Sequence, residues 1–186
     1  MESKIRGSVI KARKRFAEDH FGEGAWERLI SAMTEEDRAV LGGLIVAAGW
    51  YSFETGERLD RAIVDVLGGG DQSVFEEIGR KSARENLGGV HASFIKPGDP
   101  QGFLAQTKSI YKFYYSSGSR EYEQTGPASG VITTRDAEDF SVADCLTVIG
   151  WHKEALALCG ASNVRITETQ CRARGDAVCR YELAWG

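Results

Sequence analysis

The sequence predicts an α+β fold in which an antiparallel sheet packs against several helices. Two observations predict it. Apolar residues recur at helical spacing through the first half of the chain, and alternating segments paired around tight turns occupy much of the second half. The expected order is a strand, a series of helices, two strands, a long helix and two final strands. At 186 residues the chain is long enough for one core, so we expect a single domain over residues 1–186.

A short strand over residues 5–10 and a helix over residues 11–20 are expected at the beginning of the chain. Two glycines, Gly22 and Gly24, then break the helix. A second helix is indicated by four apolar residues that share one helical face: Trp26, Leu29, Ile30 and Met33. The stretch Thr34-Glu-Glu-Asp37 resembles a capping box and predicts the start of another short helix.

Two longer helices are expected in the middle of the chain. The first covers residues 58–67, and its apolar face consists of Leu59, Ile63, Val66 and Leu67. The three glycines at 68–70 end this helix, because glycine adopts the left-handed C-cap conformation at low cost. Asp71 is then expected to be the N-cap of a helix that runs to Asn86.

The second half of the chain combines helices with strands. Asp99-Pro100 predicts an N-cap and a first helical proline for an aromatic-rich helix that runs to Tyr115. Ser141-Val-Ala-Asp144 is a second capping box and starts a long helix that ends near Leu158. Two pairs of strands are expected, over residues 119–124 and 129–134 and then over residues 164–171 and 177–185.

Composition excludes several classes of protein. A net charge of −4 argues against a general nucleic-acid binder. The longest apolar stretch, Leu41 to Tyr51, is too short to span a bilayer, and the first residues lack the apolar region of a signal peptide. We therefore expect a cytoplasmic protein with no nucleic-acid or membrane partner. The basic run Lys11–Arg15 is interpreted as a solvated helix face, with a phosphate or lipid patch as the alternative.

The four cysteines are the most chemically specific feature of the sequence. Cys171 and Cys179 lie on either side of a Gly-Asp turn, and Glu168 precedes them by about one strand length. Thiolates together with a carboxylate suit tetrahedral zinc. Cys145 and Cys159 lie near one stripe of the preceding helix, so either residue could supply a further ligand. Buried cysteines that merely fill the core are the alternative interpretation.

The stretch Cys171-Arg-Ala-Arg-Gly-Asp-Ala-Val-Cys179-Arg-Tyr-Glu-Leu resembles the C-terminal signature of 4-vinyl-reductase-type domains. The same signature occurs in sensor domains of bacterial activators of aromatic-compound catabolism. In those sensors, an early Cys, a Glu three residues before a second Cys and a third Cys eight residues later hold zinc. The resemblance implies a structural zinc clamp within residues 141–186, held by Cys145, Glu168, Cys171 and Cys179.

The N-terminal half is similar to haem-NO/oxygen-binding domains, in Lys4-Ile-Arg-Gly-Ser-Val-Ile-Lys and in Phe21-Gly-Glu-Gly-Ala-Trp26-Glu. Those domains share one fold with Golgi transport-tethering subunits, and this fold is the one we expect. Over the whole chain the sequence most resembles a family found in myxobacteria, in stretches such as Asp144-Cys-Leu-Thr-Val-Ile-Gly-Trp-His152.

The resemblance to haem domains fails at their haem-binding residues. Tyr111 stands about where those domains have the proximal histidine, and Val131-Ile-Thr133-Thr-Arg135 replaces their Tyr-x-Ser-x-Arg clamp for the haem propionates. Although tyrosine can ligate haem iron, we do not expect haem in this chain. The expected cofactor is structural zinc.

We expect a non-enzymatic sensory or regulatory module that binds a small hydrophobic or aromatic molecule. The aromatic helix and its surroundings would line the cavity, with polar contributions from His91, Tyr111, Tyr115 and Tyr122. A homodimer or a separate signalling partner would carry the output. The alternatives are an interaction or dimerisation scaffold without a small ligand and, less favoured, an enzyme similar to the vinyl reductases that act on tetrapyrrole precursors.

Overall fold

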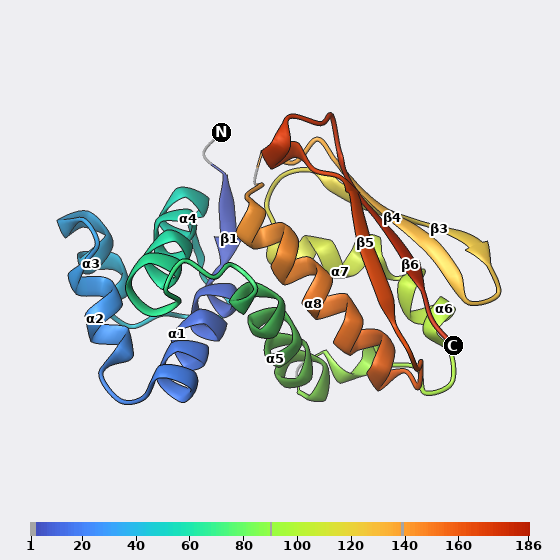
Figure 1. The fold of residues 1–186 in the computed structure, drawn as a ribbon, viewed down its shortest axis with the longest axis horizontal. Coiled ribbons are helices and arrows are strands. Elements are labelled where there is room, and N and C mark those ends of the chain that lie inside the picture. The colour runs from blue at the N-terminus through green and yellow to red at the C-terminus, as the bar shows by residue number, and fades with distance from the viewer. Residues whose placement is uncertain (1–2, 90, 139) are drawn as a thin grey trace. The chain divides into compact units, whose positions relative to one another are not determined.

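A computed structural model describes residues 3–89, 91–138 and 140–186 and confirms the α+β fold with antiparallel sheets (Figure 1). The chain separates into two compact units. The first contains the chain up to Val74 together with Tyr114–Ser116, and the second contains Phe75–Phe113 and Ser117–Gly186. This division does not test the expectation of a single domain over residues 1–186, which therefore stays a prediction.

The first unit is mainly helical. Its two short strands, β1 (Lys4–Arg6) and β2 (Trp50–Ser52), pair antiparallel. Its helices are α1 (Gly7–Phe21), α2 (Ala25–Ser31), α3 (Glu35–Leu41) and α4 (Phe53–Ala62), and α4 continues as a π-helical turn over Ile63–Leu67. As predicted, the Thr34 hydroxyl caps α3 by accepting a hydrogen bond of 3.2 Å from the Asp37 amide.

The strand expected over residues 5–10 is only three residues long, and α1 begins at Gly7. The cause is a distant segment that caps the helix. The amides of Gly7 and Ser8 donate hydrogen bonds of 2.9 Å to the carbonyl groups of Gly49 and Ala47. With its first N–H groups satisfied, the helix begins earlier than the local pattern predicts. The strand β2, which pairs with β1, was not predicted.

Two carboxylate–guanidinium pairs connect the helices of this unit. Arg13 and Asp60 are both buried and lie 2.6 Å apart, which joins α1 to α4. Arg58 donates to Asp37 at 2.7 and 2.8 Å, which joins α4 to α3. The hydrogen bonds from Arg58 lower the pKa of Asp37. Arg13, in the middle of the basic run of α1, is thus a structural residue.

The second unit contains a four-stranded antiparallel sheet with helices. The strands are β3 (Ser119–Gly126), β4 (Ser129–Arg135), β5 (Arg165–Gln170) and β6 (Cys179–Ala184), in the spatial order β3-β4-β6-β5. The helices are α5 (Val74–Gly88), α6 (Pro100–Leu104), α7 (Thr107–Tyr114) and α8 (Val142–Leu158), with short 3₁₀ turns at Ala92–Phe94 and Arg172–Arg174. Helix α8 lies along the sheet beside β5 (Figure 1).

Both predicted strand pairs and the long helix α8 are found. The predicted aromatic helix instead divides into α6 and α7, and the predicted N-cap Asp99 holds α6 by accepting a hydrogen bond of 2.7 Å from the Gly102 amide. Asp71 does not cap α5 directly. Its carboxylate accepts from the Ser73 amide at 2.8 Å, which closes a turn, and the helix begins at Val74.

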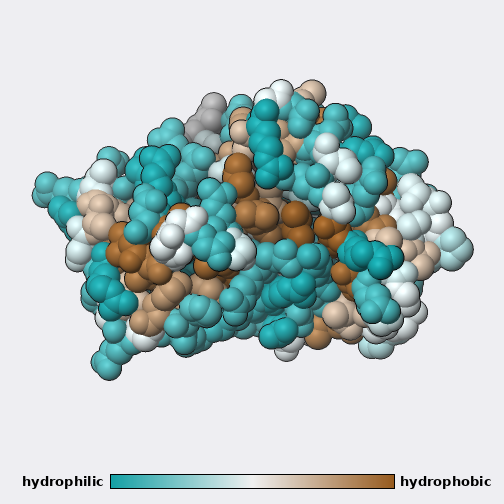
Figure 2. Space-filling view, viewed as in Figure 1, coloured by the Kyte–Doolittle hydropathy of each residue, from teal (hydrophilic) through white to brown (hydrophobic). Residues whose placement is uncertain are grey.

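Helices α5 and α8 approach closely because glycine stands at both crossing points. A Cβ atom on Gly150 would overlap the carbonyl oxygen of Glu76, and one on Gly79 would overlap the carbonyl oxygen of Thr147. No helix in the described part of the chain is long and apolar enough to cross a membrane. On the face drawn in Figure 2, hydrophilic side chains predominate, with hydrophobic ones visible at the left and across the middle of the view.

Candidate functional site

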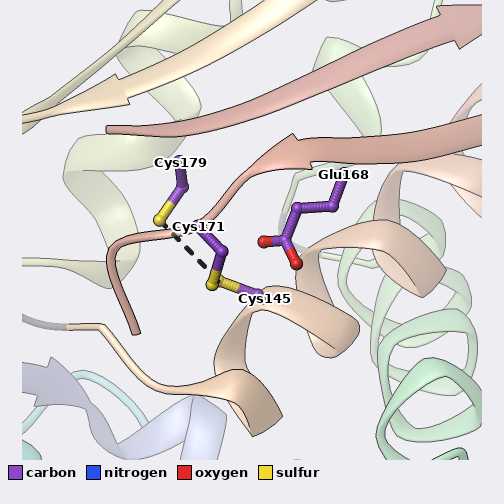
Figure 3. Close-up of side chains that lie close together, drawn as sticks. All are labelled: Cys145, Glu168, Cys171 and Cys179. Carbon is purple, nitrogen blue, oxygen red and sulfur yellow. Dashed lines mark hydrogen bonds between the residues drawn. The ribbon is translucent and has the colours of Figure 1, made fainter. Parts of the chain in front are cut away.

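Three cysteines and one glutamate of the second unit converge. One potential ligand atom from each of Cys145, Glu168, Cys171 and Cys179 lies within 4.8 Å of those of the other three (Figure 3). Cys145 lies in the first turn of α8 and Glu168 on β5, whereas Cys171 follows β5 and Cys179 begins β6. We call this set the Cys3Glu cluster. Because it joins α8 to both strands of the hairpin, its geometry depends on all three elements.

The loop between β5 and β6 turns tightly, which brings the two hairpin cysteines together. The Asp176 carboxylate accepts a hydrogen bond of 2.7 Å from the Cys171 amide, and Gly175 has the φ of +99° that the turn requires. The Arg172 amide donates to the Cys179 sulfur at 3.4 Å. On the helix side, the Ser141 hydroxyl caps α8 by accepting from the Asp144 amide at 3.0 Å, as predicted.

The three sulfur atoms are close enough to interact. The Cys145 sulfur lies 3.6 Å from that of Cys171 and 3.8 Å from that of Cys179, and all three thiols are buried. The Cys145 thiol donates to Cys179, which raises the pKa of Cys145, and burial raises it further. Accepting that bond lowers the pKa of Cys179, whereas burial raises the pKa of Cys171. The proton therefore leaves Cys179 most easily.

The Glu168 carboxylate is buried, and only one of its oxygens has a hydrogen-bond partner among the described residues. Its side chain is 6% exposed, and one oxygen accepts a hydrogen bond of 3.0 Å from Arg174. The other oxygen, Oε1, is buried and has no hydrogen-bond partner among the described residues. A buried carboxylate oxygen without a hydrogen-bond partner is costly, and this one lies beside three thiols. Figure 3 shows the carboxylate directed toward the Cys145 sulfur.

The structure distinguishes the two helix cysteines. Cys159, the alternative to Cys145, is fully buried at the C-terminal end of α8 and does not belong to the cluster. Its carbonyl oxygen accepts a hydrogen bond of 2.8 Å from the Gly98 amide. Cys159 is thus placed as a core residue, and the four atoms that could hold a metal ion come from the residues that the resemblance implied.

Of the four residues expected at a ligand cavity, His91 lies among aromatic rings. Its ring centre is 4.9 Å from that of Phe113 and 5.8 Å from that of Phe94, and those two phenylalanine rings are also 5.8 Å apart. His91 and Phe94 are half-buried, and Phe113 is 43% exposed. Burial lowers the pKa of His91, so its imidazole is neutral near pH 7. We call these three residues the His91 aromatic cluster.

The three tyrosines do not join this cluster through any described contact. Tyr111 is buried, and its hydroxyl donates a hydrogen bond of 2.9 Å to the Ser117 carbonyl. The Tyr122 hydroxyl donates to the side-chain oxygen of Gln101. Tyr115 belongs to the first unit, where it forms a bridge with Ile5 of β1. Their assignment as ligand residues stays a prediction.

Sequence reasoning missed some residues around these sites. Phe94 was not singled out, because it is an isolated aromatic residue in a loop. Arg120 is only 7% exposed, stacks on the Tyr111 ring at 4.8 Å and donates to the Thr134 hydroxyl at 2.9 Å. A charged residue on an alternating strand suggests a solvent-facing position, so only the tertiary structure reveals this buried one. The ion pair between Arg174 and Glu168 was also not predicted from the sequence.

No protein-family model and no curated protein sequence matches the chain. Among solved structures, it is similar to a mutant H-NOX (haem NO/oxygen-binding) protein from K. algicida in the unliganded Fe(II) state, with a TM-score of 0.74 and 12% identity over 97% of this chain and 96% of that chain. It is also similar to an H-NOX protein from S. oneidensis in the Fe(II)NO state, with a TM-score of 0.71 and 14% identity over 97% and 99% of the two chains. An oxygen-binding H-NOX domain related to soluble guanylate cyclases, in its oxygen complex, matches with a TM-score of 0.67 and 9% identity over 97% and 94%.

These similarities establish the fold, which was predicted from the haem-NO/oxygen-binding part of the resemblance. They give no support to the 4-vinyl-reductase and myxobacterial parts. The expected cofactor was wrong: we expected structural zinc and no haem, whereas the similar structures are those of haem-binding proteins.

The residues of this chain match a haem site only in part. At the position expected for the proximal histidine, the Tyr111 hydroxyl is bound to Ser117 and its ring faces Arg120, so the phenol is not presented as an axial ligand. His152 is fully buried, with its Nδ1 atom 2.9 Å from the Val148 carbonyl oxygen. His91 is the residue that offers a neutral, part-exposed imidazole beside apolar rings.

Proposed function

We propose that the chain is a non-enzymatic sensory module that binds one small ligand. The observation that carries this proposal is the fold, which resembles H-NOX proteins over 97% of the chain. The printed descriptions of those proteins concern unliganded, NO-bound and oxygen-bound states, which are states of small-molecule binding. Fold alone does not carry function, so the proposal depends on whether this chain has residues suited to a ligand.

The His91 aromatic cluster supports binding of a small apolar or aromatic molecule. Three rings that remain partly exposed provide apolar surface and edge-to-face contacts. Because burial lowers its pKa, the neutral His91 imidazole can accept one hydrogen bond or ligate a metal of a bound group. A ligand would therefore combine an apolar body with one donor or one metal centre, and haem is the first such group to test.

The test is a calorimetric titration of the purified chain with haemin and, separately, with 4-phenylphenol, which has an apolar body and one hydrogen-bond donor. We expect saturable binding of at least one of these probes at one molecule per chain. Truncation by Phe113→Ala should weaken binding about tenfold, the value of one buried aromatic side chain. His91→Ala should also weaken it. Leu158→Ala, at an apolar residue of similar exposure on α8, should leave it unchanged.

Two results would contradict the proposal. One is the absence of saturable binding by either probe to folded protein. The other is equal binding to the wild type and to the variants Phe113→Ala and His91→Ala, which would place the ligand elsewhere and remove the support that the cluster provides.

We also propose that Cys145, Glu168, Cys171 and Cys179 bind one metal ion. Three features support it: the close approach of the four ligand atoms, the N–H group directed at the Cys179 sulfur, and the buried Glu168 oxygen without a described partner. Thiol ligands select soft or borderline ions. With all four positions filled by protein atoms, such an ion would fix α8 to the hairpin and leave no open position for chemistry.

Elemental analysis for first-row transition metals tests this second proposal. We expect about one ion per chain, lost in Cys171→Ser and retained in Cys159→Ser, since Cys159 is a buried thiol outside the cluster. Folded, metal-free protein after expression in metal-rich medium would contradict it.

A further inference from the structure

The first unit exposes an apolar loop between α3 and β2. Leu44 is 88% exposed and Val46 is 51% exposed, and Trp50, which begins β2, is 40% exposed. Single exposed apolar side chains are ordinary, but adjacent ones rimmed by charge mark a surface for interaction. The exposed side chains of this loop therefore indicate a surface for interaction.

Hydrogen bonds hold this loop in place, so the exposure of its side chains is fixed by the fold. The carbonyl groups of Ala47 and Gly49 accept from the first amides of α1 at 2.9 Å. The Val46 amide donates to the Tyr51 hydroxyl at 2.8 Å, and Ile45, between the two exposed residues, is only 7% exposed. Ile45 anchors the loop, while Leu44 and Val46 are held in the solvent.

Positive charge lies directly beside the exposed Leu44. An open groove of about 280 Å³ is lined by Lys11, Lys14 and Arg15 of α1 on one side and by Gly43, Leu44 and Ile45 on the other. The only acidic residue in its lining is Glu18, which lies 3.8 Å from Lys14 in an exposed pair. The groove is therefore cationic although the chain carries a net charge of −4. Within the same loop, the Ala48 carbonyl accepts a hydrogen bond of 2.6 Å from Arg6, which also stacks on the Trp50 ring.

We propose that this surface docks on an anionic lipid membrane. Lys11, Lys14 and Arg15 would contact lipid phosphates, while Leu44 and Val46 would enter the boundary between headgroups and acyl chains. Cations beside apolar side chains are the combination that binds an anionic bilayer surface, and Trp50 is of a type enriched at that boundary.

The exposure of Leu44 favours a lipid surface over a protein partner. A side chain that protrudes this far would require a matching pocket in a protein, whereas a bilayer accommodates it without one. The proposal departs from our expectation of no membrane partner, which was drawn from the lack of a spanning segment. Docking on the surface needs no such segment.

The test is sedimentation of the full-length chain with vesicles of phosphatidylcholine alone or with about one-third phosphatidylserine. We expect binding only to the anionic vesicles, weakened by added salt. Removing one cation in Lys11→Ala or Lys14→Ala should weaken the partition about fivefold each. Leu44→Asp should weaken it about tenfold or more.

Matched variants distinguish this surface from general charge and hydrophobicity. Lys112→Ala removes an exposed cation from α7, and Leu158→Asp changes an apolar residue that is 40% exposed on α8. Neither should alter the partition. Thermal unfolding of each variant checks that the change at the surface leaves the fold intact.

Several outcomes would overturn the proposal: no binding to anionic vesicles, equal binding to neutral ones, or equal losses in the matched variants. A wild-type dimer in sedimentation equilibrium that Leu44→Asp converts to a monomer would also overturn it, because a second copy would then cover the loop. Binding to anionic vesicles that is lost in Leu44→Asp and in Lys14→Ala, with the controls unchanged, supports it.

Discussion

The buried His152 makes the stability of this chain depend on pH in a way that can be calculated. His152 is 4% exposed on α8, and its Nδ1 atom lies 2.9 Å from the Val148 carbonyl oxygen. Burial, with a further contribution from the Arg120 charge, lowers the pKa of His152 to about 3. In the unfolded chain the pKa of histidine is about 6.5. The native state therefore holds a neutral imidazole that the unfolded state protonates below about pH 6.5.

The direction of the pH effect on stability follows from this difference between the folded and unfolded pKa values. Because the folded pKa is the lower one, the contribution to stability is complete above about pH 6.5 and is lost progressively as the pH falls toward 3. Protonation of the unfolded state lowers the free energy of unfolding by about 0.2 kcal/mol at pH 7 and by about 2 kcal/mol at pH 5. We therefore expect His152 to remove about 2 kcal/mol of stability between these two pH values.

Urea denaturation of the wild type and of His152→Asn at pH 7, 6 and 5 measures this contribution. The asparagine amide can still donate to the Val148 carbonyl but cannot take up a proton. Its free energy of unfolding should fall by about 2 kcal/mol less than that of the wild type over this range. Parallel pH dependences of the wild type and His152→Asn, within about 0.5 kcal/mol, would refute the reasoning.

Three further substitutions test the packing and the candidate metal centre. Gly150→Ala should destabilise the chain by about 3 kcal/mol in urea denaturation, because the added methyl group overlaps the Glu76 carbonyl where α8 crosses α5. Asp60→Asn should cost about 3 kcal/mol by the same assay, because it leaves the buried Arg13 without its carboxylate. Cys171→Ser should lower the metal content to near zero and lower the thermal midpoint, as removal of a structural ion does.

A control variant accompanies each of these three substitutions. Gly88→Ala, whose added methyl group meets no described atom within 4 Å apart from the local backbone of its own helix, should leave stability nearly unchanged or raise it. Adding Arg13→Met to Asp60→Asn should recover part of the lost stability, since no unpaired buried charge remains. Cys159→Ser should keep the bound metal. If Gly150→Ala were as stable as the wild type, α5 and α8 could not cross as closely as described.

Local signals predicted much of the second unit. The Ser141 capping box, the Asp99-Pro100 helix start and the two strand pairs all depend on residues close together in the sequence, and all are found. The four residues of the Cys3Glu cluster were named from the resemblance, and the structure brings them together. Spacing alone could not choose between Cys145 and Cys159; that choice required the resemblance.

What the sequence could not predict depends on contacts between distant residues. The early start of α1 requires carbonyl groups about 40 residues away, and β2 exists only as the partner of β1. The break between α6 and α7 lies at Ala105 and Gln106, where no glycine or proline marks it. The expectation about the cofactor was an error of another kind, because it rested on single sequence positions, whereas the similar solved structures are those of haem-binding proteins.

Native mass spectrometry of the purified chain, with and without added haemin or 4-phenylphenol, tests the proposed ligand binding most directly. Binding of one small molecule per chain, lost when His91 and Phe113 are both replaced by alanine, is the result that a sensory module predicts. A chain that retains and accepts no small molecule, while folded, would contradict it.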